Sequence, residues 1–505
     1  MKEHRAIVIG SGFGGLAVAI RLQAMGFKTT LLEKREKVGG RAYQLRDRGY
    51  TFDMGPSLIT APSILRRLFA AAGRPLEDYV ELVPLDPFYR VYFHDGTYLD
   101  YTADRERMRA QMARFNPQDA ARYDRFMEAT RPIYEAVIRE GLGARPFDTL
   151  GKLLAFLPRA LRLGAIQPVA RFASRYFEDF RHHFLYSFHP LFIGGNPFRA
   201  PAVYIMIPYL EREEGVWFAR GGMYSLVEAM ARLFMEIGGR IHTGTPVQRI
   251  VVQKGKAVGV EAADGFHPAE LVVSNADPGY TYQYLVDPAW RRRWTDRRIA
   301  RLHYSMSCFL LYLGVRRTYP QLLHHTLMLS PRYRELIEDI FERKVLAPDF
   351  SLYLHAPTRT DPTMAPPGCE SLYVLAPVPH LQASINWSEE APRYAERLLE
   401  FLEAWGLEGL QENLEVCHYF TPEDFARHLN APYGSAFSIE PRLTQTAYFR
   451  PHNRSEDIRG LYLVGAGTHP GAGLPGVVLS AEATAWAIAQ DYNVTSPSTA
   501  ALASA

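Results

Sequence analysis

Two glycine-rich runs could each cradle a phosphate group, and the first occupies residues 10–15 (GSGFGG). In such a turn Gly10 permits the sharp bend after a strand, Gly12 lets the backbone approach a pyrophosphate, and Gly15 lets the next helix pack closely on the sheet. The free N–H groups at the start of that helix, and its partial positive charge, would hold the phosphates. A glycine-rich turn without a ligand is the alternative.

The elements around this run are those that a nucleotide site needs. Residues 5–10 (RAIVIG) predict a buried strand, residues 16–26 an amphipathic helix ended by glycine, and residues 28–34 a second strand. Glu33 ends the second strand, 23 residues after Gly10. A carboxylate in that place can accept both hydroxyls of a ribose, so the unit predicts a dinucleotide site.

The segment after Glu33 offers a second close backbone approach at Gly39 and Gly40. Arg41 follows and could neutralise pyrophosphate charge, while Asp53 and the dipeptide at 55–56 (Gly-Pro) would shape a loop beside a flavin ring. A structural hairpin is the alternative. Near the C-terminus, residues 461–476 (LYLVGAGTHPGAGLPG) predict a strand, a glycine-rich loop and a helix start that can stabilise a reduced flavin. Two such turns suit one long dinucleotide better than two nucleotides, because the second turn has no acidic strand end of its own.

The composition excludes several other classes of protein. The 505 residues carry a net charge of +3, which is too near neutral for a dedicated nucleic-acid binder. Three cysteines cannot form a disulfide framework, and they suit a reducing compartment. No apolar run is long enough for a spanning helix, and no secretory signal is predicted. Aromatic residues make up 12%, which suits either a large apolar cavity or an ordinary core.

Residues 149–177 contain five cations, no acidic residue and many interleaved leucines. We expect helices that are apolar on one side and basic on the other, as a docking surface for anionic lipid would be. A solvated basic helix packed on the core is the alternative. The histidine spacings match no metal motif, so no metal site is predicted.

Several runs together resemble the bacterial-type phytoene desaturases of carotenoid biosynthesis, from about residue 5 to 491. They are the N-terminal run with GGRA, YLEREEGVWFARGG (209–222), VVSNADP (272–278), GSAFSIEPRLTQTAYFRPHNR (434–454) and the C-terminal signature. The resemblance implies an FAD-dependent enzyme that dehydrogenates phytoene in several steps to neurosporene or lycopene. It also implies a peripheral position on the cytoplasmic face of the membrane and reoxidation by oxygen or a quinone; an oligomer is compatible with it.

Matching positions imply which residues bind the cofactor: Gly10, Ser11, Gly12, Phe13, Gly14, Gly15, Glu33, Lys34, Gly40, Arg41, Gly55, Pro56, Ser57, Val247, Gly467, Pro475, Gly476 and Val477. Some relatives carry a suggested acid–base pair near the place of residues 150–157. That stretch has no carboxylate here, so the catalytic residues stay unassigned.

We therefore expect an α/β protein with a Rossmann-like FAD-binding domain of the glutathione-reductase/amine-oxidase type, a mixed-sheet substrate domain and a helical membrane-facing cap. The expected FAD-binding segments are 1–85, 222–290 and 445–491, and the substrate segments are 86–125, 186–221 and 291–444. The cap is expected at 126–185, and a disordered tail at 492–505.

Other functions on a related fold are a flavin-dependent carotenoid isomerase, a carotenoid end-group oxidase or ketolase, and a flavoprotein that carries carotenoids without turnover. The nearly continuous signature disfavours all three. A soluble amine oxidase is less compatible still, because it would not need the basic apolar segment 149–177.

Overall fold

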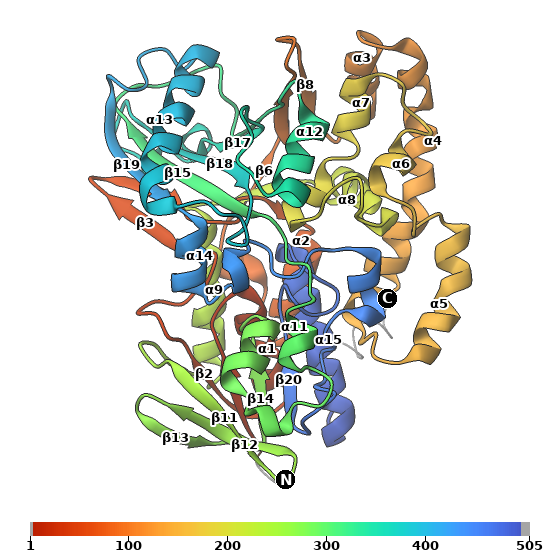
Figure 1. Cartoon of the computed structure of the whole chain (residues 1–505), viewed down its shortest axis with the longest axis vertical. Coiled ribbons are helices and arrows are strands. Elements are labelled where there is room, and N and C mark those ends of the chain that lie inside the picture. The colour runs from red at the N-terminus through yellow and green to blue at the C-terminus, as the bar shows by residue number, and fades with distance from the viewer. Residues whose placement is uncertain (1–3, 496–505) are drawn as a thin grey trace.

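The computed structural model describes residues 4–495, and one half of the molecule is built on a five-stranded parallel sheet (Figure 1). All neighbouring strands are parallel. Their order is β10 (Arg240–His242), β2 (Lys28–Leu32), β1 (Arg5–Ile9), β14 (Leu271–Ser274) and β20 (Leu461–Leu463). The last four residues of β1 are buried, as expected for a strand covered on both faces. The predicted strand–turn–helix–strand unit at residues 5–34 is confirmed.

Helices α1 (Phe13–Ala24), α9 (Met223–Glu236) and α15 (Leu474–Tyr492) belong to this half of the molecule. Helix α1 packs against both α9 and α15. The contact between α1 and α15 contains a buried ion pair in which Arg21 Nη2 donates to Glu482 Oε2 at 2.9 Å. Helices α1 and α15 thus begin side by side, and each begins at a glycine-rich loop.

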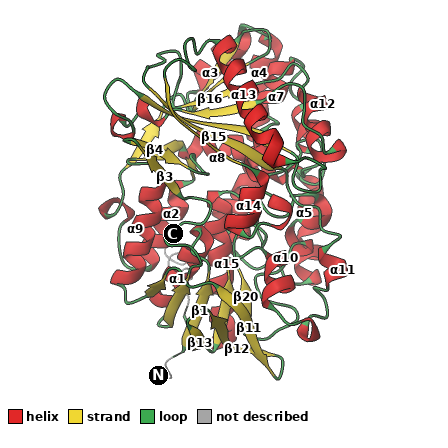
Figure 2. Ribbon diagram, turned by 60° about the vertical axis from the view of Figure 1, so that its left-hand side comes forward, coloured by secondary structure: helices red, strands yellow, loops and turns green. Residues whose placement is uncertain are grey.

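A seven-stranded mixed sheet forms the other half, above the parallel sheet in Figure 2. Its order is β19 (Leu414–Phe420), β15 (Ser307–Val315), β18 (Glu370–Val378), β17 (Leu352–His355), β16 (His325–Met328), β7 (Tyr89–Tyr92) and β8 (Tyr98–Tyr101). Only β16 and β7 are parallel neighbours. Helix α13 (Trp387–Trp405) covers one face, where Trp387 stacks on Phe309 at 5.7 Å.

A layer of helices lies along one side of the molecule, at the right in Figure 1. It contains α3 (Arg105–Ala113), α4 (Pro117–Tyr134), α5 (Leu150–Arg162), α6 (Val169–Ala173), α7 (Phe180–Leu185) and α8 (Ile207–Glu214). Among the described residues, no helix is both long and apolar enough to span a membrane.

Smaller elements complete the chain. Three small sheets contain β11 (Val247–Gln253), β12 (Lys256–Ala262) and β13 (Gly265–Pro268); β3 (Gln44–Asp47) and β4 (Tyr50–Asp53); and β5 (Ile59–Thr60), β9 (Val216–Ala219) and β6 (Leu82–Leu85). The remaining helices are α2 (Pro62–Ala71), α10 (Pro278–Tyr280), α11 (Asp296–Ile299), α12 (Tyr333–Glu338) and α14 (Pro422–Leu429). Residue 492 ends α15, and the rest of the predicted tail from 496 onward lies outside the described residues.

Candidate active site

One cavity of about 680 Å³ connects the glycine-rich loops of the parallel sheet with the seven-stranded sheet. Most of the predicted cofactor residues line it, although they come from four distant parts of the chain. The lining includes Gly10, Ser11, Gly12, Phe13, Gly14, Glu33, Lys34, Gly40, Arg41, Gly55, Pro56, Ser57, Val247, Pro475, Gly476 and Val477.

Two predicted residues, Gly15 and Gly467, do not line this cavity. A Cβ atom on Gly15 would lie 2.0 Å from the carbonyl oxygen of Gly10, and one on Gly467 would lie 2.3 Å from Cδ of Pro278. Both glycines are therefore explained by close packing behind the loops. This agrees with the packing role expected for the third glycine of the turn.

Glu33 is held against the first glycine loop at the end of β2. Its Oε2 accepts hydrogen bonds from the backbone N–H of Ser11 at 2.9 Å and from Ser11 Oγ at 2.5 Å, and its Oε1 accepts from the N–H of Arg35 at 2.9 Å. Each carboxylate oxygen has two lone pairs, so the group retains capacity for ribose hydroxyls. The buried carboxylate is thus oriented toward the loop before any ligand binds.

Glycine backbone from two loops meets in the cradle. A Cβ atom on Gly40, whose φ is +57°, would lie 3.1 Å from Cα of Gly12, so a side chain there would occupy the space between the two loops. Arg41 lies beside them and donates from Nε to the carbonyl oxygen of Ala436 at 2.7 Å. Burial lowers the pKa of Arg41, while the nearby Asp277 raises it.

The N-termini of α1 and α15 also border the cavity, and each contributes partial positive charge. The cavity thus combines a ribose acceptor, a side-chain-free phosphate cradle, an arginine and two helix N-termini. These features fit FAD, whose two phosphates need cations and free N–H groups and whose ribose needs an acceptor.

The other end of the cavity is apolar, and the seven-stranded sheet forms one wall of it. Successive side chains of a strand point to opposite faces, so alternate residues of β15 and β18 face the cavity. They are Cys308 and Leu310 on β15 and Tyr373, Leu375 and Pro377 on β18. The aromatic side chains of this end are Phe147, Phe156, Phe184, Phe188, Phe192, Tyr204, Tyr333, Tyr353, Phe420, Phe425 and Phe437. These eleven are a minority of the aromatic residues, which are 29 Tyr, 28 Phe and 6 Trp, so most of the aromatic content lies outside the cavity.

Sequence reasoning missed a buried carboxylate in this apolar end. Glu211 and Glu33 are the carboxylates among the described residues that line the cavity. Glu211 Oε2 accepts from Tyr89 Oη at 3.0 Å and lies 3.3 Å from Nε2 of His189, and all three side chains are buried. These residues are far apart in the chain, and the run YLEREE gives no signal that one of its acids points inward.

Helix α5 lies between the cavity and the exterior. Phe156 on α5 and Phe147 just before it line the cavity. Four leucines at helical spacing are exposed instead: Leu150 (55%), Leu154 (58%), Leu157 (39%) and Leu161 (54%). Helix α5 contacts the turn Ala447–Phe449, where Ala447 lines the cavity and Phe449 is exposed.

Charged residues around α5 differ in whether they form ion pairs. Asp148 binds Lys152 Nζ at 2.6 Å and Arg454 Nη1 at 2.8 Å, and it is not among the cavity residues. Arg159 binds Glu140 at 2.5 Å, whereas Arg162 is exposed. The predicted combination of apolar and basic residues on 149–177 is therefore present at the surface.

The whole chain is similar to known flavoproteins. Residues 13–489 match the family described as flavin containing amine oxidoreductase. The chain is 49% identical to a lycopene-forming phytoene desaturase of Pseudescherichia vulneris over 96% of this chain and 99% of that protein. It is 44% identical to a neurosporene-forming phytoene desaturase of Cereibacter sphaeroides, over 95% and 94%. A putrescine oxidase structure, 13% identical, superimposes with a TM-score of 0.65 over 97% of this chain and 99% of that one, which shows the shared fold.

Proposed function

Because the chain belongs to the flavin-containing amine oxidoreductases and, within them, to the phytoene desaturases, we propose that it converts phytoene by successive dehydrogenations to neurosporene or lycopene. The observation that carries the proposal is that one continuous cavity has an FAD-type cradle at one end and an aromatic, almost wholly apolar chamber at the other. A long unsaturated hydrocarbon is the substrate class that such a chamber fits.

The segments of the chain support a division of labour. The parallel sheet takes its strands from 5–32, 240–242, 271–274 and 461–463, all within the segments expected to bind FAD, and it carries the Rossmann-type glycine turn. The seven-stranded sheet takes its strands from 89–101 and 307–420, within the expected substrate segments. Helix α5 and its neighbours then form the cap of the chamber.

Each desaturation removes a hydride and a proton from neighbouring carbon atoms and leaves a new double bond. FAD, when bound, supplies the hydride acceptor. The apolar chamber excludes water, and its aromatic faces weakly stabilise the positive charge that develops on the allylic carbon. We assign Glu211 as the proton acceptor, because it is the carboxylate that lines the apolar end of the cavity. The proton passes to this carboxylate, and the electron pair of the broken C–H bond becomes the π bond. Tyr89 and His189 orient that carboxylate.

The substrate also dictates where the protein works. Placing a forty-carbon hydrocarbon in water costs on the order of 30 kcal/mol, at about 0.8 kcal/mol per carbon group, so it has to be taken from a bilayer. The exposed leucines of α5 and the turn Ala447–Phe449 supply an apolar surface beside the chamber, and Arg162 supplies a cation for anionic lipid.

We place the protein on the cytoplasmic face of the membrane, as a peripheral protein. Its three free cysteines suit that reducing compartment. Oxygen or a membrane quinone is the proposed final electron acceptor, because the sequence has a single glycine fingerprint with an acidic strand end.

The test is an aerobic incubation of purified protein, FAD and phytoene-loaded liposomes, followed by chromatography and absorption of the extracted pigment. We expect coloured products, and the length of the chromophore counts the steps. Colourless phytoene, despite bound FAD, would refute the proposed activity. Assays on coloured carotenoids would then separate an isomerase, which leaves the hydrogen count unchanged, from an end-group oxidase, which adds oxygen, and from a carrier, which changes neither.

A further inference from the structure

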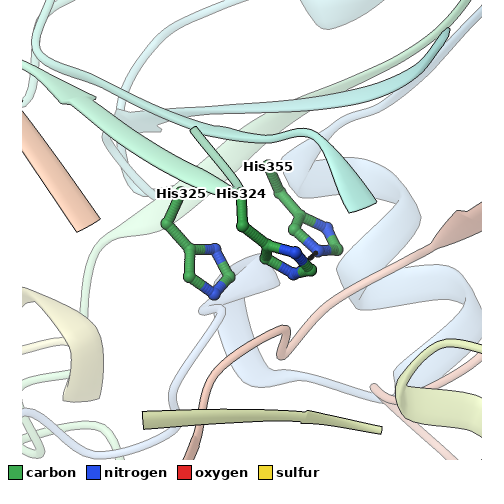
Figure 3. Close-up of side chains that lie close together, drawn as sticks. All are labelled: His324, His325 and His355. Atoms are coloured by element: carbon green, nitrogen blue, oxygen red, sulfur yellow. Dashed lines mark hydrogen bonds between the residues drawn. The ribbon is translucent and has the colours of Figure 1, made fainter. Parts of the chain in front are cut away.

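Three buried histidines meet at one end of β16 and β17, outside the FAD cradle (Figure 3). His325 begins β16 and pairs across the sheet with His355 at the end of β17, and His324 directly precedes His325. The side chains are 6% exposed for His324 and 0% for the other two. One ring nitrogen from each residue lies within 4.8 Å of the others.

Hydrogen bonds within the protein leave this cluster incompletely satisfied. His324 Nδ1 lies 2.6 Å from Thr360 Oγ1, His325 Nδ1 lies 2.6 Å from Tyr353 Oη, and the Nε2 atoms of His324 and His355 lie 3.1 Å apart. His325 Nε2 and His355 Nδ1 have no hydrogen-bond partner among the described residues.

No choice of tautomers removes the deficit. A neutral imidazole carries a proton on one ring nitrogen and a lone pair on the other. Moving the proton between the two nitrogens only changes whether the unpaired nitrogen is a donor or an acceptor. Two buried nitrogens stay unsatisfied in every arrangement, and each costs about 1–3 kcal/mol.

We propose that His324, His325 and His355 bind a divalent transition metal ion of the zinc type through their Nε2 atoms. Two nitrogen ligands of a tetrahedral zinc ion, with bonds of about 2.0–2.1 Å, lie about 3.4 Å apart, close to the separation of the His324 and His355 Nε2 atoms. Nitrogen ligands without carboxylates favour zinc, copper or nickel over magnesium or calcium. A fourth position is left for water or another small ligand.

Two of the three rings have the outer contacts of metal ligands, whereas Nδ1 of His355 has no partner among the described residues. Thr360 and Tyr353 bond the Nδ1 atoms of His324 and His325, which fixes the rings with Nε2 free for the ion. Tyr353 lines the cavity and also bonds Ser57 Oγ at 2.5 Å. A bound ion would therefore hold β16 and β17 together and fix one wall of the cavity, a role that does not depend on the substrate.

The site can be tested without an activity assay. Untagged, FAD-loaded protein is dialysed against Zn²⁺, then against metal-free buffer, and its metal content is measured by mass spectrometry. We expect stoichiometric zinc, a thermal midpoint that falls on chelation and recovers with Zn²⁺, and the visible absorption of tetrahedral cobalt after loading with Co²⁺. His355→Gln should lose these properties, whereas His418→Gln, at a residue exposed on β19, should retain them.

The cobalt spectrum of the unmodified protein keeps the test decisive if His355→Gln does not fold. Absence of both retained zinc and the cobalt bands would refute the site and leave a neutral histidine cluster bridged by water. Equal zinc content in folded His355→Gln would also refute it, because the ion would then be bound elsewhere.

Discussion

Replacing Leu154 and Leu161 of α5 by glutamine should weaken binding to membranes. The two side chains are 58% and 54% exposed, so docking would bury about one further leucine side chain in total. Full burial of a leucine contributes about 1.5–3 kcal/mol, so the double variant should lose about 2 kcal/mol of binding free energy. That corresponds to about a 30-fold weaker affinity for lipid.

The assay is flotation with anionic liposomes, titrated to give an apparent Kd. Because both leucines are already half exposed, the free energy of unfolding should change by less than about 0.5 kcal/mol for each substitution. Met235→Gln with Phe266→Gln is a matched control, since these residues are each 52% exposed but lie on α9 and β13. The loss should persist at high salt, because it is apolar in origin, whereas the contribution of the arginines is screened.

Unchanged flotation of the Leu154→Gln, Leu161→Gln protein would refute α5 as the docking helix. An equal loss in the control pair would also contradict the reasoning, since it would show a general response to lost surface apolarity.

Three further predictions concern carboxylates. Glu33→Arg should abolish FAD retention, measured as flavin absorbance per chain. Glu36→Arg, at a neighbouring exposed residue, should retain FAD. Full flavin content in Glu33→Arg would contradict the assignment of Glu33 as the ribose acceptor. Glu211→Gln should lower kcat by about 10²–10⁴-fold with unchanged flavin content, whereas Glu213→Gln should leave kcat unchanged. Equal kcat values for the two variants would exclude Glu211 as the proton acceptor. Burial raises the pKa of Asp53 to about 7 in the folded protein. The folded state therefore holds the proton of Asp53 more tightly than the unfolded state does. The free energy of unfolding is highest below about pH 4 and falls as the pH rises through 7. Asp53→Asn should therefore gain up to about 4 kcal/mol over the wild type in urea unfolding between about pH 4 and pH 8, and a pH-independent difference would contradict the burial argument.

The sequence was most informative where backbone geometry itself determines binding. The turn at 10–15 and Glu33 could be predicted because glycine spacing and a strand-end acid are local features, and the structure places them together. The spacing predicted a packing role for Gly15, which the structure supports, although the resemblance also placed Gly15 among the cofactor residues; Gly12 and Gly14 line the cavity.

Sites assembled across the sheets could not be predicted. Tyr89, His189 and Glu211 meet only through the packing of β7 against the helical layer, so no local pattern identifies them. Likewise His324 and His355 are brought together by the antiparallel pairing of β16 with β17, and their separation along the chain matches no metal motif. In both cases long-range strand order, which the sequence pattern does not specify, creates the constellation.

The central claim is that the cradle and the apolar chamber act as one site on phytoene. The most direct test mixes FAD-loaded protein with phytoene-containing liposomes in the absence of oxygen and follows the flavin absorbance in a stopped-flow spectrometer. We predict bleaching of the oxidised flavin together with one new double bond in the extracted hydrocarbon for each flavin reduced. Persistent oxidised flavin with unchanged phytoene would contradict the account.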